Sequence, residues 1–402
     1  MSLFGCLIYQ KHNAKLYEEY GMRILLLSNP ESIWTKEFID KVLLPVGASV
    51  SVQCDPDAQG QFDNYYRDRG VSIIGQYKLL PWMMKIPKMR VLHRALRKKK
   101  ALKPYAGKFD KIIVLYVTPF ALECAKMLSD SHTDVYAFFI GSDILRSTPR
   151  NTAGLQELLK DHTVSVVCES CQTASAFHEK IGQNISLSAH IIYLGNAVLP
   201  YINKRIKDGR NICKGMFDIP QDLISVCVGY NASPAQQHLK VIRHLKNLDR
   251  RIQDKICVVI PAAYQGTVEY LAQIQAELQS SEMEYRILTK FLDAEEAAAL
   301  RIATDIFINA QITDALSASV TEAYYAGAKL LSADWLKYQE FYSWDLEYER
   351  FGSFDEMQRI LARCVDAGLT HSNRNRDIVF EEQSWDTCKD QWHNLLNEGK
   401  RS

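Results

Sequence analysis

Residues 111–140 read KIIVLYVTPFALECAKMLSDSHTDVYAFFI, and this stretch decides the fold class. Its two ends, 111–116 and 135–140, are almost continuously apolar, as in strands that are buried on both faces of a sheet. The segment 119–130 between them has helical character. Parallel strands need a crossover connection of this kind, usually a helix. The stretch therefore predicts one βαβ unit.

The same alternation of apolar strands and helical segments runs through most of the chain. Further strands are expected at 24–27, 164–167, 190–194, 224–228, 256–260, 285–289, 305–309 and 328–332. A polar segment rich in Gly, Asn, Lys and Pro interrupts the alternation after residue 194. The sequence thus predicts an α/β protein with two doubly wound, Rossmann-like domains in series. Its expected parts are an N-terminal extension (1–20), a first domain (21–200), a linker (201–222), a second domain (223–375) and a C-terminal helix (376–402).

The overall composition is that of an ordinary globular protein. The chain has 402 residues, of which 47% are hydrophobic and 24% charged, and its net charge is +1. Its ten cysteines are scattered through strand-like runs without the spacing of a disulfide scaffold, which favours reduced thiols in a cytoplasmic protein. No apolar run reaches the roughly 18 residues of a membrane-spanning helix. We expect neither export nor a transmembrane anchor.

Residues 78–108 contain many Lys and Arg residues and no acidic residue. Such a run is usually a solvated helix face, but the neighbouring Leu79-Leu-Pro-Trp-Met-Met84 favours contact with an anionic membrane surface. No recognition motif supports nucleic-acid binding. We therefore expect peripheral association with the inner face of a membrane and no nucleic-acid partner.

A second informative stretch, Ile312–Leu331, places Asp314 and Glu322 eight residues apart around a run of small residues. Ser319-Val-Thr-Glu322 fits a capping box at a helix start, and Gly327 fits a cap at the helix end. This interpretation leaves Asp314 unexplained. The alternative is a phosphate site at a helix N-terminus, with a carboxylate on each side for sugar hydroxyls. The residues alone leave both interpretations open.

The acid-x7-acid pattern, followed by an apolar helix, Ala-Gly and a strand, resembles the E-x7-E signature of GT-B nucleotide-sugar glycosyltransferases, especially family 4 (group 1). Phe139–Asp143, Leu194–Pro200 and Val228–His238 resemble further segments of that family in the same order. The loop Ile260–Gly266 is distantly similar to TDP-N-acetylfucosamine:lipid II transferases. The resemblance implies an acceptor-binding first domain and a nucleotide-sugar-binding second domain that face each other across a cleft. The C-terminal helix is then expected to pack back on the first domain.

Positions that match the family motifs imply roles for individual residues. Glu322 would bind the ribose hydroxyls, and Asp314 would face the donor sugar as a catalytic residue, although Asp in this place departs from the family pattern. The remaining implied donor-binding residues are Ser317, Ala318, Ser319, Gly229, Asn231, Ser233, His238, Tyr264 and Lys290.

The loop 229–238 departs from family 4 in a second way. It lacks the Arg and Lys that usually neutralise the leaving diphosphate. The candidate replacements are Lys240, Arg243 or Lys290, or else a helix N-terminus together with His238.

Candidate residues of the first domain follow its strands. Asp143, at the end of an apolar strand, is either a catalytic group at the sugar or acceptor, or a turn residue. The loop after the first strand contains the acceptor or cleft candidates Asn29, Glu31 and Trp34, and Trp34 is equally compatible with a core position.

Two patterns raise the question of a metal ion. Asp55-Pro-Asp57 is a D-x-D, the metal-binding pattern of the other major glycosyltransferase fold, but the βα alternation opposes that fold. Cys168 and Cys171 form a C-x-x-C without the second pair that zinc requires. We expect no metal and no cofactor, with a nucleotide-diphosphate sugar as co-substrate.

The sequence therefore favours a glycosyltransferase that acts on a glycan or polyprenyl-linked acceptor in bacterial surface polysaccharide synthesis. The alternatives are a GT-B-like sugar-nucleotide epimerase and a non-catalytic sugar-nucleotide-binding scaffold. A dinucleotide-dependent oxidoreductase is disfavoured because no G-x-G-x-x-G follows the first strand. The stereochemical outcome stays open, since E-x7-E enzymes usually retain, whereas fucosamine-type relatives invert and need a base such as Asp143 or Glu31.

Overall fold

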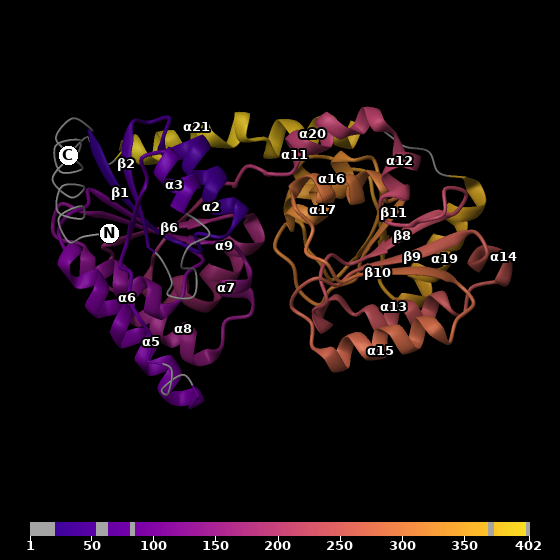
Figure 1. Cartoon of the computed structure of the whole chain (residues 1–402), viewed down its shortest axis with the longest axis horizontal. Coiled ribbons are helices and arrows are strands. Elements are labelled where there is room, and N and C mark those ends of the chain that lie inside the picture. The colour runs from indigo at the N-terminus through magenta and orange to yellow at the C-terminus, as the bar shows by residue number, and fades with distance from the viewer. Residues whose placement is uncertain (1–20, 54–62, 81–84, 369–373, 399–402) are drawn as a thin grey trace. The chain divides into compact units, whose positions relative to one another are not determined.

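The computed structural model describes residues 21–53, 63–80, 85–368 and 374–398. The chain divides into two compact units, one comprising residues up to Leu194 together with the chain from Cys388, and the other comprising Gly195–Thr387 (Figure 1). The expected N-terminal extension, the Asp55–Asp57 pair and residues 81–84 of the membrane prediction lie outside the described residues.

The first unit is built on a seven-stranded sheet with the strand order β3-β2-β1-β4-β5-β6-β7, in which all paired strands are parallel. Residues 111–140 form β4, α6 and β5, as predicted. The strands are β1 (Met22–Leu27), β2 (Ala48–Gln53), β3 (Ser72–Ile74), β4 (Lys111–Leu115), β5 (Asp134–Phe139), β6 (Val164–Cys168) and β7 (Ala189–Ile191).

Helices cover both faces of this sheet (Figure 1). One layer contains α5, α6 and α8, whose apolar residues pack on β4 and β5 in a continuous core. The first unit contains α2 (Ile33–Phe38), α3 (Asp63–Asp68), α5 (Pro87–Leu102), α6 (Pro119–Leu128), α7 (Ser142–Leu145), α8 (Pro149–Leu159), α9 (Cys171–Phe177) and α10 (Gln183–Ile185), with π-helical turns at Ile39–Leu43 and His178–Gly182 and a 3-10 turn at Lys103–Tyr105.

The C-terminal helix α21 (Trp385–Glu398) begins in the second unit and ends in the first. Trp392 is fully buried and lies edge-on to Phe38 and Phe138, with ring centroids 4.8 and 5.0 Å away. Its indole N–H donates to the carbonyl of Tyr193 at 3.1 Å. The end of the chain thus supplies part of the core of the first unit.

The second unit has a six-stranded parallel sheet with the order β10-β9-β8-β11-β12-β13. Its strands are β8 (Ile224–Val228), β9 (Ile256–Pro261), β10 (Glu284–Leu288), β11 (Ile306–Asn309), β12 (Lys329–Ala333) and β13 (Glu349–Phe351). Two doubly wound α/β domains in series are therefore confirmed.

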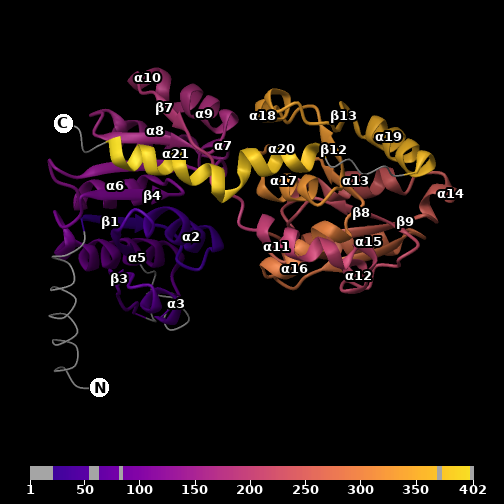
Figure 2. The same cartoon turned by 90° about the horizontal axis from the view of Figure 1, so that it is seen from above.

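Two helical layers enclose the second sheet. Figure 1 shows α11, α16 and α17 on one face and α13 and α15 on the other, and Figure 2 shows α20 beside α17. The helices are α11 (Leu199–Arg205), α12 (Arg210–Gly215), α13 (His238–Leu245), α14 (Arg250–Gln253), α15 (Val268–Gln279), α16 (Ala294–Ala303), α17 (Ala318–Tyr325), α18 (Gln339–Ser343), α19 (Phe354–Ala367) and α20 (Arg374–Gln383), with 3-10 turns at Ile206–Asp208 and Pro234–Gln236.

The segment 201–222, predicted as a linker, is largely helical and belongs to the second unit. Its helices α11 and α12 both pack on α16. The buried ammonium of Lys214 lies 2.7 Å from the buried carboxylate of Asp305, and Arg210 lies 3.2 Å from the same carboxylate. The sequence of this segment is polar, although the segment is packed, because some of the side chains that it buries are charged and pair with Asp305.

Helix α13 begins at a buried histidine. The side chain of His238 is fully buried, with its Nδ1 atom 3.4 Å from the hydroxyl of Tyr270 on α15. Burial lowers the pKa of His238 to about 4, because the imidazolium loses its hydration, although a hydrogen bond with the backbone of Asn231 opposes this shift. His238 is therefore uncharged at neutral pH.

We expect the protein to lose stability as the pH falls from about 6.5 to about 4, because the unfolded chain binds a proton there that the folded chain does not. The pKa difference corresponds to a loss of roughly 3 kcal/mol in the free energy of unfolding at pH 4. Urea titrations between pH 4 and 8 should show this slope for the wild type and a shallower slope for His238→Gln. His244→Gln, on the exposed face of the same helix, is the control. Equal slopes for wild type and His238→Gln would contradict the assignment.

Candidate functional site

The candidate site lies at the carboxyl edge of the second sheet, where β8 is flanked by β9 on one side and β11 on the other. Such a reversal of strand order is the usual ligand position in doubly wound sheets. The loops that follow β8 and β11, 229–237 and 310–317, leave the sheet side by side. The amide of Gly229 donates to Ile308 at 3.0 Å, and that of Ile312 donates to Ala235 at 2.9 Å.

Gly229 has a backbone requirement at the first position of its loop. Its φ is +66°, and a Cβ atom there would lie 2.6 Å from the side-chain oxygen of Gln236. Both conditions favour glycine, since a side chain would be strained and would collide. The tight turn lets the side-chain amide of Gln236 donate to Gln311 at 3.1 Å, which fastens the two loops together.

Asp314 is the centre of a hydrogen-bond network within the second loop. Its carboxylate is buried and accepts from the hydroxyl of Tyr338 at 2.5 Å and from the amide of Ala315 at 3.0 Å. The Tyr338 hydroxyl in turn accepts from Asn309, at the end of β11, at 2.6 Å. On the other side the hydroxyl of Tyr230 lies 3.5 Å from the carboxylate. A fixed, buried acid is therefore presented at the switch point.

Tyr230 is held by a second contact, because Gln311 donates to its hydroxyl at 2.9 Å. Burial raises the pKa of Tyr230, and the negative charge of Asp314 raises it further. The hydroxyl therefore stays protonated and can donate a hydrogen bond next to Asp314.

Glu322 forms a buried ion pair. Its carboxylate accepts from Nε of Arg301 on α16 at 2.9 Å, and the two side chains are 5% and 7% exposed. Among the described residues, the Nη1 atom of Arg301 has no hydrogen-bond partner although it is buried. One guanidinium donor next to Glu322 is thus available to a ligand oxygen.

Tyr264, in the loop after β9, lies near this pair. It is 43% exposed, and burial of the rest of the ring raises its pKa, whereas the charge of Arg301 and a hydrogen bond with Asn231 lower it. Its carbonyl accepts from the amide of Ala232 at 2.9 Å. The loops after β8 and β9 thus meet closely, and a Cβ atom on Gly266 would lie 2.5 Å from Ala232.

Three non-glycine residues at this edge have left-handed backbone conformations. They are Gln237, Gln265 and Leu316, with φ values of 58°, 63° and 51°. Each lies in a different loop of the site. Such strained conformations persist where the surrounding structure holds them and concentrate at functional sites.

Of the two interpretations left open for Ser319–Glu322, the structure contradicts the capping box. Helix α17 begins at Ala318 with Ser317 in the N-cap position, two residues earlier than a capping box at Ser319 requires, and neither a side-chain cap nor an acid occupies its first turn. Glu322 instead forms an ion pair with Arg301. By contrast, Asp293 and Glu296 form a complete capping box on α16. The first amides of α17, around Ser317, Ala318 and Ser319, are therefore available to an anion.

Asn231 and Ser233 complete the opposite wall. The side chain of Asn231 is buried and accepts from the amide of Ser233 at 2.9 Å, which shapes the loop after β8. These contacts are within the loop, so the two residues support its backbone.

The cations proposed to replace the missing Arg and Lys are engaged elsewhere. Arg243 pairs with Glu277 at 2.7 Å, the exposed Lys290 pairs with Glu296 at 2.7 Å, and Lys240 donates to Gln237 at 2.8 Å. His238 is buried and neutral and adds no positive charge. The cation that the structure brings to Glu322 is Arg301, which the sequence analysis missed.

Asp143 of the first unit is buried and bound to the backbone. Its carboxylate accepts from the amides of Val117, Gly141 and Ile140 at 2.8, 2.9 and 3.2 Å. Burial raises its pKa, while these three hydrogen bonds oppose the shift. This geometry favours the turn interpretation. The carboxylate oxygens of Asp143 already accept hydrogen bonds from the backbone of the loops after β4 and β5 and so hold these two loops together.

The other first-unit candidates lie after β1. Asn29 and Glu31 are exposed, and the side chain of Asn29 accepts from the amide of Glu31 at 3.0 Å. Trp34 is half-buried on α2. Within the described ranges no group of three or more His, Cys, Asp or Glu side chains is arranged to hold a metal ion.

The structure thus brings together Asp314, Glu322, Ser317, Asn231, Gly229 and Tyr264, and it adds Tyr230, Gln311, Tyr338 and Arg301, which the sequence analysis did not select. Arg301 had one signal, since it is the only basic residue in the alanine-rich segment Ala294–Ala303. The sequence carried no signal for Tyr338, because this residue is 24 positions from Asp314 and contacts it only in the folded chain.

No protein-family model matches the chain, and no curated protein matches it by sequence. Solved structures do match. HepE from Anabaena in complex with UDP and glucose superposes with a TM-score of 0.66 at 15% identity, covering 94% of this chain and 100% of that one.

Two further structures match to a similar extent. Sucrose-phosphate synthase from Thermosynechococcus elongatus gives a TM-score of 0.68 at 12% identity, over 94% of this chain and 99% of that one. A UDP-forming α,α-trehalose-phosphate synthase from Burkholderia vietnamiensis gives 0.65 at 12% identity, over 95% and 100%. Together with the two parallel sheets, these similarities show that the chain has the α/β fold of GT-B glycosyltransferases.

Proposed function

We propose that the chain is a glycosyltransferase that moves a sugar from a nucleotide-diphosphate donor to a glycan or polyprenyl-linked acceptor. The observation that supports this most directly is the placement of Asp314 and Glu322 on either side of the uncapped start of α17, at the switch point of the second sheet. HepE, a structural neighbour, has been crystallised with UDP-glucose, so UDP-sugars are the first donors to test.

The proposed donor site uses the backbone for the diphosphate. The amides of Ser317, Ala318 and Ser319 and the dipole of α17 would receive its oxygens. Glu322 would accept from the ribose hydroxyls. Nη1 of Arg301, which has no partner among the residues that the structure describes, would donate a hydrogen bond to another oxygen of the nucleotide sugar. Preorganised donors of this kind stabilise the charge that develops on the leaving diphosphate, and the proposal includes no obligatory metal ion.

Asp314 is proposed to act on the sugar. Glycosyl transfer builds up positive charge on the sugar ring, and a fixed carboxylate nearby stabilises that charge. Tyr338 holds one carboxylate oxygen, so it would act as a positioning residue. Tyr230, whose hydroxyl donates to the other carboxylate oxygen at 3.5 Å, would be a second positioning residue.

We expect Glu322→Gln to weaken UDP binding about tenfold, because the ribose hydroxyls lose a charged acceptor. Isothermal titration with UDP measures this, and a urea titration reports separately on the loss of the ion pair with Arg301. Glu277→Gln, which removes a carboxylate from an ion pair outside the site, should leave UDP affinity unchanged. Unchanged UDP affinity in a folded Glu322→Gln protein would refute the ribose assignment.

We expect Asp314→Asn to lower sugar transfer at least about 100-fold while changing UDP affinity little, because the carboxylate acts on the developing sugar charge. UDP release from a panel of UDP-sugars, with and without membrane extract and EDTA, provides the measurement. Asp366→Asn is the control, since Asp366 pairs with Arg251 at the surface. Donor binding without turnover by the wild type would favour a scaffold, and conversion of the donor sugar without transfer would favour an epimerase.

Helix α5 carries an exposed apolar surface that could contact a membrane. Its residues Val91, Leu92 and Leu96 are 67%, 61% and 59% exposed. The exposed cations Arg90 and Lys100 flank them. Apolar side chains with adjacent cations are the arrangement of helices that lie on anionic membranes. Separately, none of the helices in the described residues has both the length and the apolar character needed to cross a membrane.

We therefore expect the protein to sediment with anionic vesicles and to be released by salt, since the Debye length shortens from about 30 Å at 0.01 M to about 10 Å at 0.1 M. The triple substitution Val91→Ser, Leu92→Ser and Leu96→Ser should abolish sedimentation. Val268→Ser, which changes an exposed residue of the second unit, serves as the control. Failure of the wild type to sediment at low salt would end the membrane proposal.

A further inference from the structure

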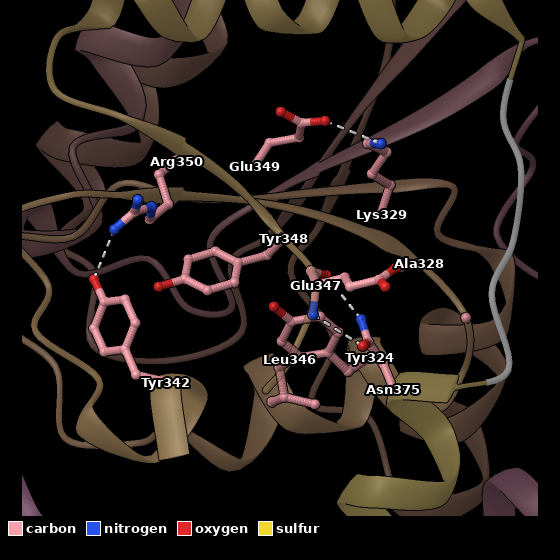
Figure 3. Close-up of a pocket in the computed structure, with 11 residues that line it drawn as sticks. Tyr324, Ala328, Lys329, Tyr342, Leu346, Glu347, Tyr348, Glu349, Arg350 and Asn375 are labelled. Carbon is pink, nitrogen blue, oxygen red and sulfur yellow. Dashed lines mark hydrogen bonds and ion pairs between the residues drawn. The ribbon is translucent and has the colours of Figure 1, made fainter. Parts of the chain in front are cut away.

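The second unit contains a hollow of about 510 Å³ that does not belong to the candidate donor site (Figure 3). It is bounded by the turn that joins α17 to β12, the edge strand β13 and the segment that leads into β13. The residues around it are Tyr324, Gly327, Ala328, Lys329, Tyr342, Leu346, Glu347, Tyr348, Glu349, Arg350 and Asn375. Its volume lies in the range of small-molecule sites, about 300–1,000 Å³.

The hollow and the donor site share no lining residue. Lys329 begins β12 and pairs in register with Ile306, the first residue of β11. The donor site follows Asn309, the last residue of that strand. Because both strands run in the same direction, Lys329 and the donor loops lie toward opposite edges of the sheet.

The charges around the hollow balance one another. Two cations, Lys329 and Arg350, face two acids, Glu347 and Glu349. Lys329 lies 3.1 Å from Glu349, and Glu349 also pairs with Arg363 at 2.7 Å. The other acid, Glu347, pairs with Arg374 at 2.7 Å. Arg374 also pairs with Asp345, and Arg350 lies 3.8 Å from Asp334. The four cations are therefore matched by four acids, and the lining favours an uncharged ligand.

Tyrosine hydroxyls supply hydrogen-bonding groups at the hollow. Tyr324 is 1% exposed, and among the described residues its hydroxyl has no hydrogen-bond partner (Figure 3). Buried hydroxyls are normally bonded, so this group lacks a partner that a ligand can provide. The hydroxyl oxygen of Tyr342 accepts from Arg350 at 3.0 Å and from Tyr348. Its own proton remains to be donated to a ligand.

Hydrogen bonds and ring packing hold the residues that line the hollow in place. The side chain of Asn375 on α20 donates to the carbonyl of Glu347 at 2.8 Å and accepts from its amide at 3.0 Å. The ring of Tyr324 packs edge-on against Phe341 with the centroids 5.3 Å apart. A preformed hollow loses little conformational entropy when it binds a ligand.

We propose that this hollow is a second carbohydrate site, which binds a short neutral oligosaccharide. Tyrosine faces can pack on the apolar faces of sugar rings, and the tyrosine, carboxylate and guanidinium groups can bond their hydroxyls. The paired charges can orient hydroxyls without attracting an ionic ligand. The site goes beyond sugar transfer, since it would hold a glycan chain away from the reacting atoms.

Equilibrium binding of neutral trisaccharides tests the proposal without any need for turnover. The panel comprises maltotriose, cellotriose, laminaritriose, mannotriose and chitotriose, measured by saturation-transfer NMR and calorimetry. We expect at least one member to bind the wild type, Tyr324→Phe to weaken that binding about fivefold to tenfold, and Tyr342→Ala to abolish it. Tyr324→Phe should keep the melting temperature of the wild type or raise it, because it removes an unpaired buried hydroxyl.

The controls separate this site from the donor site. Tyr285→Phe, a matched loss of a hydroxyl on β10, should leave trisaccharide binding unchanged, and Asp314→Asn should do the same. Tyr342→Ala should keep the wild-type affinity for UDP. The proposal is overturned if no trisaccharide binds, if Asp314→Asn abolishes the binding, or if Tyr342→Ala instead abolishes binding of glucose 6-phosphate. All of these outcomes can be read whether or not the donor proposal holds.

Discussion

The parallel pairing of β8 with both β9 and β11 is the constraint on which the second unit depends. Parallel neighbours need helical crossovers, so every strand ends at the same edge and every loop that follows a strand begins there. The crossover after β8 leads to β9 on one side, and the crossover after β10 returns the chain to β11 on the other side. The loops after β8 and β11 are therefore neighbours at the carboxyl edge. Asp314 could not reach the hydroxyls of Tyr230 and Tyr338 together without this arrangement.

The candidate donor site and the hollow beside β13 differ in how their charges are paired. At the candidate donor site, Nη1 of Arg301 is buried beside Glu322 and has no hydrogen-bond partner in the described part of the chain. A buried, incompletely bonded cation favours an anionic or strongly polar ligand. Around the second hollow, each acid has a basic partner. The difference separates a region suited to a nucleotide from one suited to uncharged hydroxyls.

Most of the strands could be predicted because buried parallel strands are continuously apolar, a pattern that needs no knowledge of contacts. β2 was missed because Ser49 and Ser51 interrupt its apolar run, and β3 and β13 were missed because three residues carry too little pattern. Asp314 and Glu322 could be selected by their spacing. The partner of Glu322 could not be selected, because Arg301 contacts Glu322 only where α16 packs on α17. Since Glu322 pairs with Arg301, it does not form the capping box that its spacing from Ser319 suggested.

The position of Trp392 has a consequence for how the protein is made. The first unit needs this side chain, from near the end of the chain, to fill a core that otherwise consists of residues before Leu194. Domains usually fold in order as they leave the ribosome. Here the segment synthesised first cannot complete its core until residue 392 has also been synthesised, whereas residues 195–387 form a continuous unit. The half of the chain made second can therefore be the first to finish folding.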